Sequence, residues 1–462
     1  RRQRKMCIRD RGHYYEGIRA ANFYLKETAG LTFDEWKYSD DYEAIMKEFT
    51  NYQYEVRFLR AYFYFELIKR YRNIPFVLDV LAQNEANGVN PESYEKIAKF
   101  IVDECSDLAQ ILPVNYDNFS TKEKGRVTRA AAMALKSRVT LYMASPLFSE
   151  DSEDKWKQAA EAAYDIIKQK TDLGLDLVPY PQIFNDVNNQ KAEVILYRPT
   201  GESGDFEKAN FPIGVEGGKT STCPTQNLME AYDMKDGTPF VWNNQSNPYD
   251  NRDPRMKYTI VCNEMKWPVD PVEIWEGGTN GLPLQNATTT GYYLKKYVNN
   301  TISFEAGSTV TKKQHNWVLF RYGEILLNYA EAMINAFHDP NYKDAVYNMS
   351  AREAVNQIRG RTNISLPGFP SDITEKDFVK RLKNERRIEL AFEGHRFWDV
   401  RRWKELGQTA NIYGVKITKN NEVISYEKFL LETRAVTDNM YFYPIPNTER
   451  FKNPNLGQNP GW

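Results

Sequence analysis

The chain has 462 residues, enough on length alone for two or three domains with large hydrophobic cores. Its 61 lysines and arginines nearly balance 62 aspartates and glutamates, so no overall field attracts nucleic acid or an anionic membrane surface. No run of about 18 apolar residues occurs, which excludes a helix that spans a bilayer.

The first eleven residues, RRQRKMCIRDR, differ in character from the rest of the chain. They hold six basic residues and no apolar stretch, so they do not form a signal peptide. Cys7 is not preceded by the small and apolar residues of a lipoprotein-processing site. We expect residues 1–11 to be a non-native tail, joined to a chain whose true start lies upstream.

Helical spacing of apolar residues dominates the next part of the chain. It predicts helices at residues 14–29, 52–72, 91–112, 128–144 and 155–168. Gly30 and Pro146 follow the first and fourth of these, where such residues commonly end helices. The fourth, TRAAAMALKSRVTLYMA, is rich in small side chains that let neighbouring helices approach closely.

Between about residues 172 and 316 the chain holds many glycines, prolines and asparagines, with short strand-like segments at 193–198 and 258–262. The aromatic residues of this span indicate ordered structure rather than disorder. The helical pattern then resumes, at residues 321–336, 343–361 and 375–392. We therefore predict a mainly α fold: a tetratricopeptide-like helical-repeat scaffold with a loop-rich irregular region carrying short β-strands. A strict 34-residue period is absent, which indicates degenerate repeats.

The segment from 384 to 403, NERRIELAFEGHRFWDVRRW, combines charge with many aromatic residues. Helical spacing predicts ion pairs between Arg386 and Glu389 and between Glu393 and Arg396. Gly394 predicts a break between two helices. We interpret the segment as a helix packed into protein with paired charges, so Glu389→Ala or Arg396→Ala is expected to lower stability by a few kcal/mol.

Functional interpretations of this segment are weaker. Its acidic residues dilute the basic surplus that a nucleic-acid site shows. The flanking arginines hold its glutamates ionised, which argues against acid–base catalysis. His395 has no second histidine three to five residues away, so it is a poor metal ligand.

The same segment resembles the C-terminal signature of SusD/RagB-type proteins, the surface nutrient-binding lipoproteins of Bacteroidetes. Further segments similar to that family are RAYFYFELIKRYRNIPFV (60–77), PTQNLMEAYDMKDGTPF (224–240), NRDPRM (251–256) and YFYPIPNTERFKNPNLGQNPGW (441–462). The resemblance implies a SusD-like α/α superhelix. We expect a helical SusD-like part (12–212) and a RagB/SusD part (213–462), packed as one globular unit.

The resemblance also implies a function: capture of a glycan, or sometimes a peptide, at the cell surface. It implies delivery to a SusC-like TonB-dependent transporter, over which the protein closes as a lid. The protein would lie on the extracellular face of the outer membrane, held only by an N-terminal lipid anchor that this sequence lacks. Neither nucleic acid nor a cofactor is expected as a partner.

No nucleotide-binding, hydrolase or metalloprotease motif occurs, and four scattered histidines suggest neither a triad nor a metal cluster. We therefore expect a non-catalytic protein with no metal site. Two alternatives stay open: a tetratricopeptide-type scaffold that binds protein or peptide, and a helical glycoside hydrolase with a carboxylate pair brought together in space. Cys223 and Cys262 are able to pair in an exported protein, but their spacing does not decide it.

Aromatic residues are the candidate ligand contacts, because Tyr and Trp offer a flat apolar face with a polar edge that suits sugar rings. Such residues commonly act from loops on a rigid scaffold. Trp36 lies in the loop before the helix predicted at 52–72, where the family often places a binding aromatic. The other candidates are Trp267, Trp275, Tyr292 and Tyr293.

Overall fold

A computed structural model describes residues 2–150, 152–243, 247–305 and 311–462; for residues 2–10 and 83 it describes only the backbone. The side chain of Cys7 therefore lies outside the described residues. The chain divides into two compact units. Unit 1 comprises Arg1–Gly174, Arg401–Lys404 and Thr437–Trp462, and unit 2 comprises Leu175–Val400 and Glu405–Val436.

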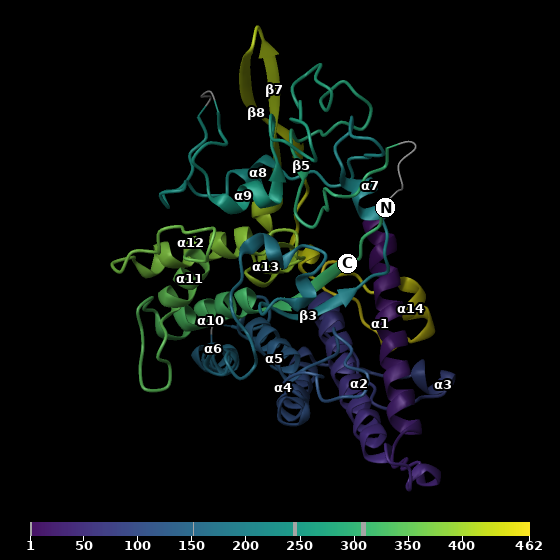
Figure 1. Ribbon diagram of the computed structural model, residues 1–462. Helices are drawn as coiled ribbons and strands as arrows, with labels where there is room; N and C mark the ends of the chain where they lie inside the picture. The colour runs from purple at the N-terminus through teal and green to yellow at the C-terminus, as the bar shows by residue number, and fades with distance from the viewer. Residues whose placement is uncertain (1, 151, 244–246, 306–310) are drawn as a thin grey trace. The chain divides into compact units, whose positions relative to one another are not determined.

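Unit 1 is built mainly from long helices (Figure 1). Its helices are α1 (Arg2–Glu27), η1 (Asp34–Trp36), α2 (Tyr42–Tyr71), α3 (Gln83–Ala86), α4 (Tyr94–Ile111), α5 (Arg129–Ala144), α6 (Glu153–Lys168), η5 (Asp438–Tyr441) and α14 (Asn447–Lys452). Two short strands, β1 (Ile74–Pro75) and β2 (Pro91–Glu92), pair antiparallel. Helix α1 packs against α2, α2 against α4, α4 against α5, and α5 against α6.

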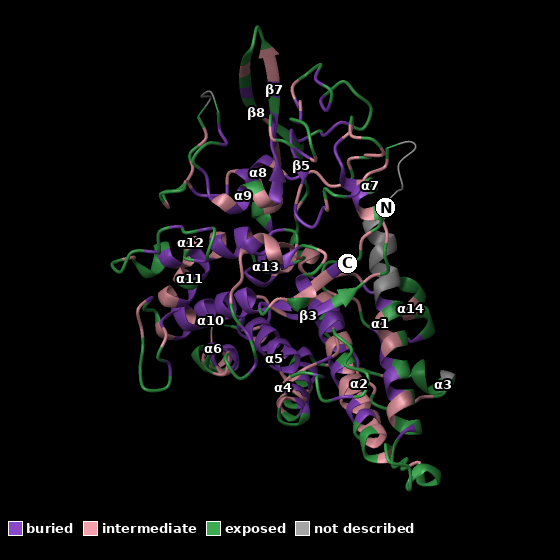
Figure 2. Cartoon of the chain, in the orientation of Figure 1, coloured by how far each residue is buried: buried purple, intermediate pink, exposed green. Residues whose placement is uncertain are grey.

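Small side chains explain the central place of α5 in this array. Nearly all of its residues are buried, including Ala130, Ala131, Ala132 and Ala134 (Figure 2). A helix with alanines on several faces lets neighbours approach on more than one side, so it is covered by both α4 and α6.

The C-terminal segment Thr437–Trp462 belongs to unit 1 although it is far from the other helices in sequence. The backbone N–H of Tyr443 donates to the carbonyl of Arg70 at 2.8 Å. The side-chain amide of Asn459 donates to the carbonyl of Tyr71 at 3.2 Å. These bonds satisfy carbonyls at the end of α2, where no further helical turn supplies donors.

Unit 2 contains shorter elements joined by long loops. Its helices are η2 (Tyr180–Ile183), η3 (Asn188–Gln190), α7 (Asp205–Asn210), α8 (Gln226–Met229), α9 (Pro254–Thr259), α10 (Tyr322–Phe337), α11 (Ala351–Arg359), α12 (Glu375–Glu389), α13 (Arg396–Arg402, its last residues in unit 1) and η4 (Leu406–Thr409). Its strands are β3 (Val194–Pro199), β4 (Ile260–Val261), β5 (Tyr293–Leu294), β6 (Asn316–Arg321), β7 (Asn411–Asn420) and β8 (Val423–Thr433). They form two-stranded antiparallel sheets: β3 with β6, β4 with β5, and β7 with β8.

The β7–β8 hairpin is the longest sheet element, and the sequence analysis did not predict it (Figure 1). Its turn residues Asn421 and Glu422 both have positive φ, as a two-residue turn between twisted strands requires. Val415, Ile417 and Tyr426 join the unit 2 core. The turn residues themselves are exposed (Figure 2).

The predicted mainly α fold with short strands is confirmed. The predicted helix at 52–72 begins ten residues earlier, at Tyr42. The helix predicted at 343–361 was wrong in its first part, because Ser350 caps α11 and residues 343–350 are loop. Cys105, Cys223 and Cys262 are free thiols, so the pairing of Cys223 with Cys262 does not occur.

Candidate functional site

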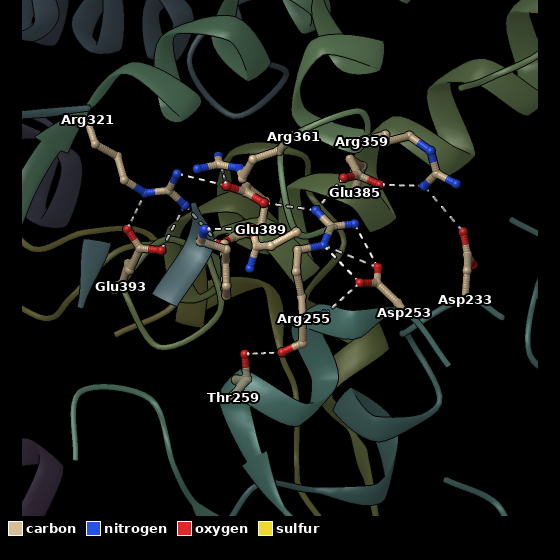
Figure 3. Close-up of polar contacts among 12 residues, drawn as sticks. Asp233, Asp253, Arg255, Thr259, Arg321, Arg359, Arg361, Glu385, Glu389 and Glu393 are labelled. Atoms are coloured by element: carbon tan, nitrogen blue, oxygen red, sulfur yellow. Dashed lines mark hydrogen bonds and ion pairs between the residues drawn. The ribbon is translucent and has the colours of Figure 1, made fainter. Parts of the chain in front are cut away.

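Glu385, Glu389 and Glu393 of the segment 384–403 belong to a set of buried acidic and basic side chains in unit 2, which we call the buried charge network (Figure 3). Its members are Glu193, Asp233, Asp253, Arg255, Lys296, Arg321, Arg359, Arg361, Glu385, Glu389 and Glu393. Their side chains are at most 2% exposed, except for Asp233 at 12%. Charges this deeply buried are tolerated only when partners satisfy them.

Glu389 receives hydrogen bonds from three arginines. Its Oε1 accepts from Arg321 Nη1 at 2.9 Å and from Arg361 Nη2 at 2.7 Å. Its Oε2 accepts from Arg255 Nη1 at 2.8 Å. Burial alone would raise the pKa of this carboxyl, but the guanidinium groups outweigh burial and hold the pKa well below its usual range.

The arginines bind further carboxylates and so extend the network. Arg255 also contacts Asp253 at 2.7 Å and Glu385 at 2.5 Å. Arg321 donates through Nε to Glu393 at 2.7 Å and through Nη1 to Glu193 at 2.8 Å. The network therefore joins α9, the end of β6 and α12, which are far apart in sequence (Figure 3).

The predicted ion pairs within this segment were wrong, although its burial with paired charges is confirmed. Arg386 Nε donates to Asp399 at 2.9 Å rather than to Glu389. Arg396 Nη2 donates to Gln408 Oε1 at 2.7 Å, near the surface, rather than to Glu393. The i, i+3 rule applies to exposed helix surfaces. Here the carboxylates face inward, where arginines from other elements lie.

Of the five predicted ligand-contacting aromatics, Trp36 is in unit 1. It ends η1, and its side chain is 50% exposed. The indole stacks on Phe33, with ring centroids 5.9 Å apart and planes 20° apart. Phe33 in turn contacts Phe49 edge-on at 4.8 Å. Trp36 is thus an exposed ring that packs on Phe33, which itself packs on Phe49.

The other four lie together at the core of unit 2. Tyr292 and Tyr293 are fully buried, and their hydroxyls donate to Gln226 Oε1 at 2.6 Å and to the carbonyl of Asn280. Trp267 is 6% exposed. Trp275 is partly buried against the same core.

A pocket of 610 Å³ in unit 1 was missed by the sequence analysis. One face of α2 lines it with Lys47, Asn51 and Tyr54, and the segment after α4 lines it with Asn115 and Asn118. Its amide and phenol groups suit hydrogen bonding to hydroxyls. The asparagines that follow the predicted helix at 91–112 were the only available signal, and they also fit an ordinary loop.

Within the described ranges, no group of three or more His, Cys, Asp or Glu residues is placed to hold a metal ion. Among those same residues, no helix combines the length and apolar character needed to cross a membrane.

Comparison with known proteins identifies the class. A model of the SusD family matches residues 183–462, and one described as "Starch-binding associating with outer membrane" matches residues 8–141. The chain belongs to the SusD family, and the SusD/RagB resemblance is confirmed. Glycan binding and association with the outer membrane are properties described for the family.

Particular relatives are similar to different extents. SusD-like protein P2 of Formosa agariphila is 30% identical over 163 residues, which cover 34% of this chain and only 28% of that relative. A SusD-like carbohydrate-binding protein of Bacteroides fragilis is 26% identical with a TM-score of 0.79, covering 98% of this chain and 86% of that one. A second SusD-like protein of B. fragilis is also 26% identical, with a TM-score of 0.78 over 97% and 85%.

Proposed function

We propose that this protein captures a nutrient oligosaccharide or polysaccharide at the outer face of the outer membrane, without cleaving it, and delivers it to a SusC-like TonB-dependent transporter. A lipid anchor upstream of this sequence would hold it there. Two findings support the proposal: membership of the SusD family, and similarity along nearly the whole chain to a carbohydrate-binding relative.

The exposed indole of Trp36 is the observation that carries the binding proposal. A sugar ring presents a C–H face that packs on an aromatic plane. Phe33 covers one face of the indole and Phe49 supports Phe33, so the ring is held in place before a ligand arrives. Such preorganisation reduces the entropy lost on binding.

Trp275, in unit 2, is a separate proposed contact, and its neighbour limits which face of the indole a ligand can use. Lys419 Nζ lies 4.7 Å from the centre of its ring, so a ligand would use the opposite face or displace the lysine. Trp267, Tyr292 and Tyr293 are buried. We propose that they act beneath the ligand, by holding the loops of unit 2 in place.

The electrostatics of Glu389, at the centre of the buried charge network, support a non-catalytic role for that carboxylate. A glycosidase needs one carboxylic acid whose pKa is raised so that it donates a proton at neutral pH. Glu389 has a lowered pKa because arginines surround it. Burial raises the pKa of Asp233 to about 6, but Arg359 lies 3.6 Å away and ties this side chain to the network.

The proposal is tested by titrating the protein with a panel of polysaccharides in affinity electrophoresis and calorimetry. Trp36→Ala is expected to weaken binding about tenfold or more, as loss of a central aromatic contact does. Phe451→Ala removes another exposed aromatic of unit 1, 87% exposed, and serves as the matched control with unchanged affinity. Release of reducing sugar, or no binding to any glycan, would contradict the proposal.

Delivery requires a separate measurement. Co-expression with a SusC-like transporter is expected to give a complex that survives affinity purification. Failure to co-purify, with glycan binding intact, would remove the transporter part of the proposal only.

A further inference from the structure

A second pocket in unit 1, of 280 Å³, lies where α4, α5 and α6 meet. Helix α5 supplies Arg129 and Lys136, and the ends of α4 and α6 supply Gln110, Asp165 and Gln169. Residues seven apart lie on the same face of a helix, about 10 Å apart along its axis. Two cations from one helix thus line a single small pocket.

The side chains of both cations are unpaired within the part of the chain that the structure describes. Neither Arg129 nor Lys136 uses its side chain in a hydrogen bond or an ion pair there. The Nε of Arg129 is buried and has no hydrogen-bond partner. A buried donor without a partner is destabilising, so an acceptor placed there would be bound favourably.

The Nε atoms of Arg60 and Arg70 in unit 1 also lack a hydrogen-bond partner, but the guanidinium groups of those arginines pair with carboxylates, as do those of two further arginines. Arg57 binds Glu104 through two hydrogen bonds of 2.9 Å. Arg126 contacts two glutamates, one of them Glu55 at 2.5 Å. By contrast, no ion pair among the described residues involves either of the two cations that line the small pocket.

The one acid in the pocket does not serve that purpose. Asp165 Oδ1 pairs with Lys168 Nζ at 2.6 Å, and within the described residues no ion pair joins it to Arg129 or Lys136. The Gln169 amide donates through Nε2 to the carbonyl of Asp165 at 2.9 Å, which leaves its oxygen free to accept. The last turns of α4 and α6 attract cations through their carbonyls, but neither Arg129 nor Lys136 donates to one within the described residues.

We propose that this pocket binds the acidic group of one sugar residue, either a carboxylate or a sulfate ester. A guanidinium and an ammonium group provide the charge-assisted hydrogen bonds that oxyanions accept, and the amides suit ring hydroxyls. The volume, near the lower end of small-molecule sites, limits the occupant to about one residue. The sugar part of the ligand rests on the proposed function; the preference for an oxyanion rests on the two cations alone.

The test is calorimetry at constant ionic strength with four probes: sodium glucuronate, glucose 6-sulfate, glucose and sodium sulfate. We expect at least one of the two acidic sugars to bind about tenfold or more tightly than both glucose and sulfate. Arg129→Gln and Lys136→Gln are each expected to weaken that binding about tenfold. Lys124→Gln, which changes an exposed lysine outside the pocket, serves as the matched control.

Any of three outcomes would overturn the inference. Glucose binds as tightly as the acidic sugars, or sulfate binds as tightly as glucose 6-sulfate. In the third, both glutamine variants bind the acidic sugar as tightly as the wild type does. A thermal melt checks that each variant is folded. If Arg129→Gln does not fold, Lys136→Gln still tests the site. The two proposals fail separately. Neutral glycans that bind through Trp36, together with acidic sugars that bind no more tightly than glucose, would sink the acidic site and leave the proposed function intact.

Discussion

The ion pairs of Glu66, on α2 in unit 1, and of Glu389, in the buried charge network of unit 2, are arranged differently. In unit 1, Glu66 accepts from Lys69 and Arg70, three and four positions further along the same helix. In unit 2, Arg255 reaches Glu389 across 134 positions of sequence. Short-range pairs add to a helix that apolar packing already holds. Long-range pairs hold together elements that are far apart in sequence, here α9, β6 and α12.

Glu389→Ala provides the strongest test of this difference. The substitution leaves three arginines without a shared acceptor in a site with no exposure, so we expect a loss of about 3–5 kcal/mol in the free energy of unfolding. Urea denaturation measures it. Glu422→Ala removes an 88% exposed partner of Lys419 and is the control, with almost no expected change. Equal losses in the free energy of unfolding for the two substitutions would contradict this expectation.

Glu66→Gln tests the short-range pair through its pH dependence. Burial opposes ionisation of Glu66, but Lys69 and Arg70 prevail and lower its pKa to about 2. A lowered pKa contributes stability above pH 4.5 that is lost as the pH falls toward 2. We expect the variant to be about 3 kcal/mol less stable at pH 7, with the difference shrinking below pH 4.5. A difference that is constant with pH would contradict this.

Asp233→Asn is expected to show the opposite sign. Burial raises the pKa of Asp233 to about 6, because Arg359 compensates only in part. The folded protein then binds more protons than the unfolded chain between pH 3.8 and 6, so wild-type stability falls as the pH rises through that window. The variant should gain about 2 kcal/mol relative to wild type between pH 4 and 7. Urea denaturation at pH 4 and pH 7 measures this, and a stability difference between variant and wild type that is the same at both pH values would refute it.

Arg396→Ala should have the smallest effect, below about 1 kcal/mol, because its partner is Gln408 near the surface. The sequence analysis had predicted a larger loss of stability, of a few kcal/mol, from a pair between Arg396 and Glu393. A loss as large as that of Glu389→Ala in the same urea assay would mean that Arg396 belongs to the buried network after all.

Local patterns in the sequence were sufficient for most helices. The predicted ranges of α4, α5 and α6 agree with the structure within three residues, because apolar spacing and end signals act over a few positions. Ser93 and Ser152 cap α4 and α6 through their side chains. The sequence also contains a hairpin signal for β7 and β8: Val415 and Ile417 alternate with polar residues, and two asparagines follow, as is typical of a turn.

The site was harder to predict because burial and pairing depend on distant residues. The sequence indicated that Glu389 would be paired, but its partners lie 28, 68 and 134 positions away. Spacing likewise did not distinguish the exposed ring of Trp36 from the buried rings of Tyr292 and Tyr293. The sequence shows which residues are charged or aromatic. Their exposure depends on how the loops fold, and loops have no periodic pattern from which exposure can be predicted.

The discontinuity of unit 1 has a consequence for synthesis. Its helices are made first, but Thr437–Trp462, which supplies donors to the end of α2, follows about 260 residues after Gly174. At about 5–20 residues per second, a ribosome needs more than about ten seconds to bridge that interval. During that interval the end of α2 lacks the donors that the C-terminal segment supplies, and a chaperone that binds nascent polypeptide has that time in which to act.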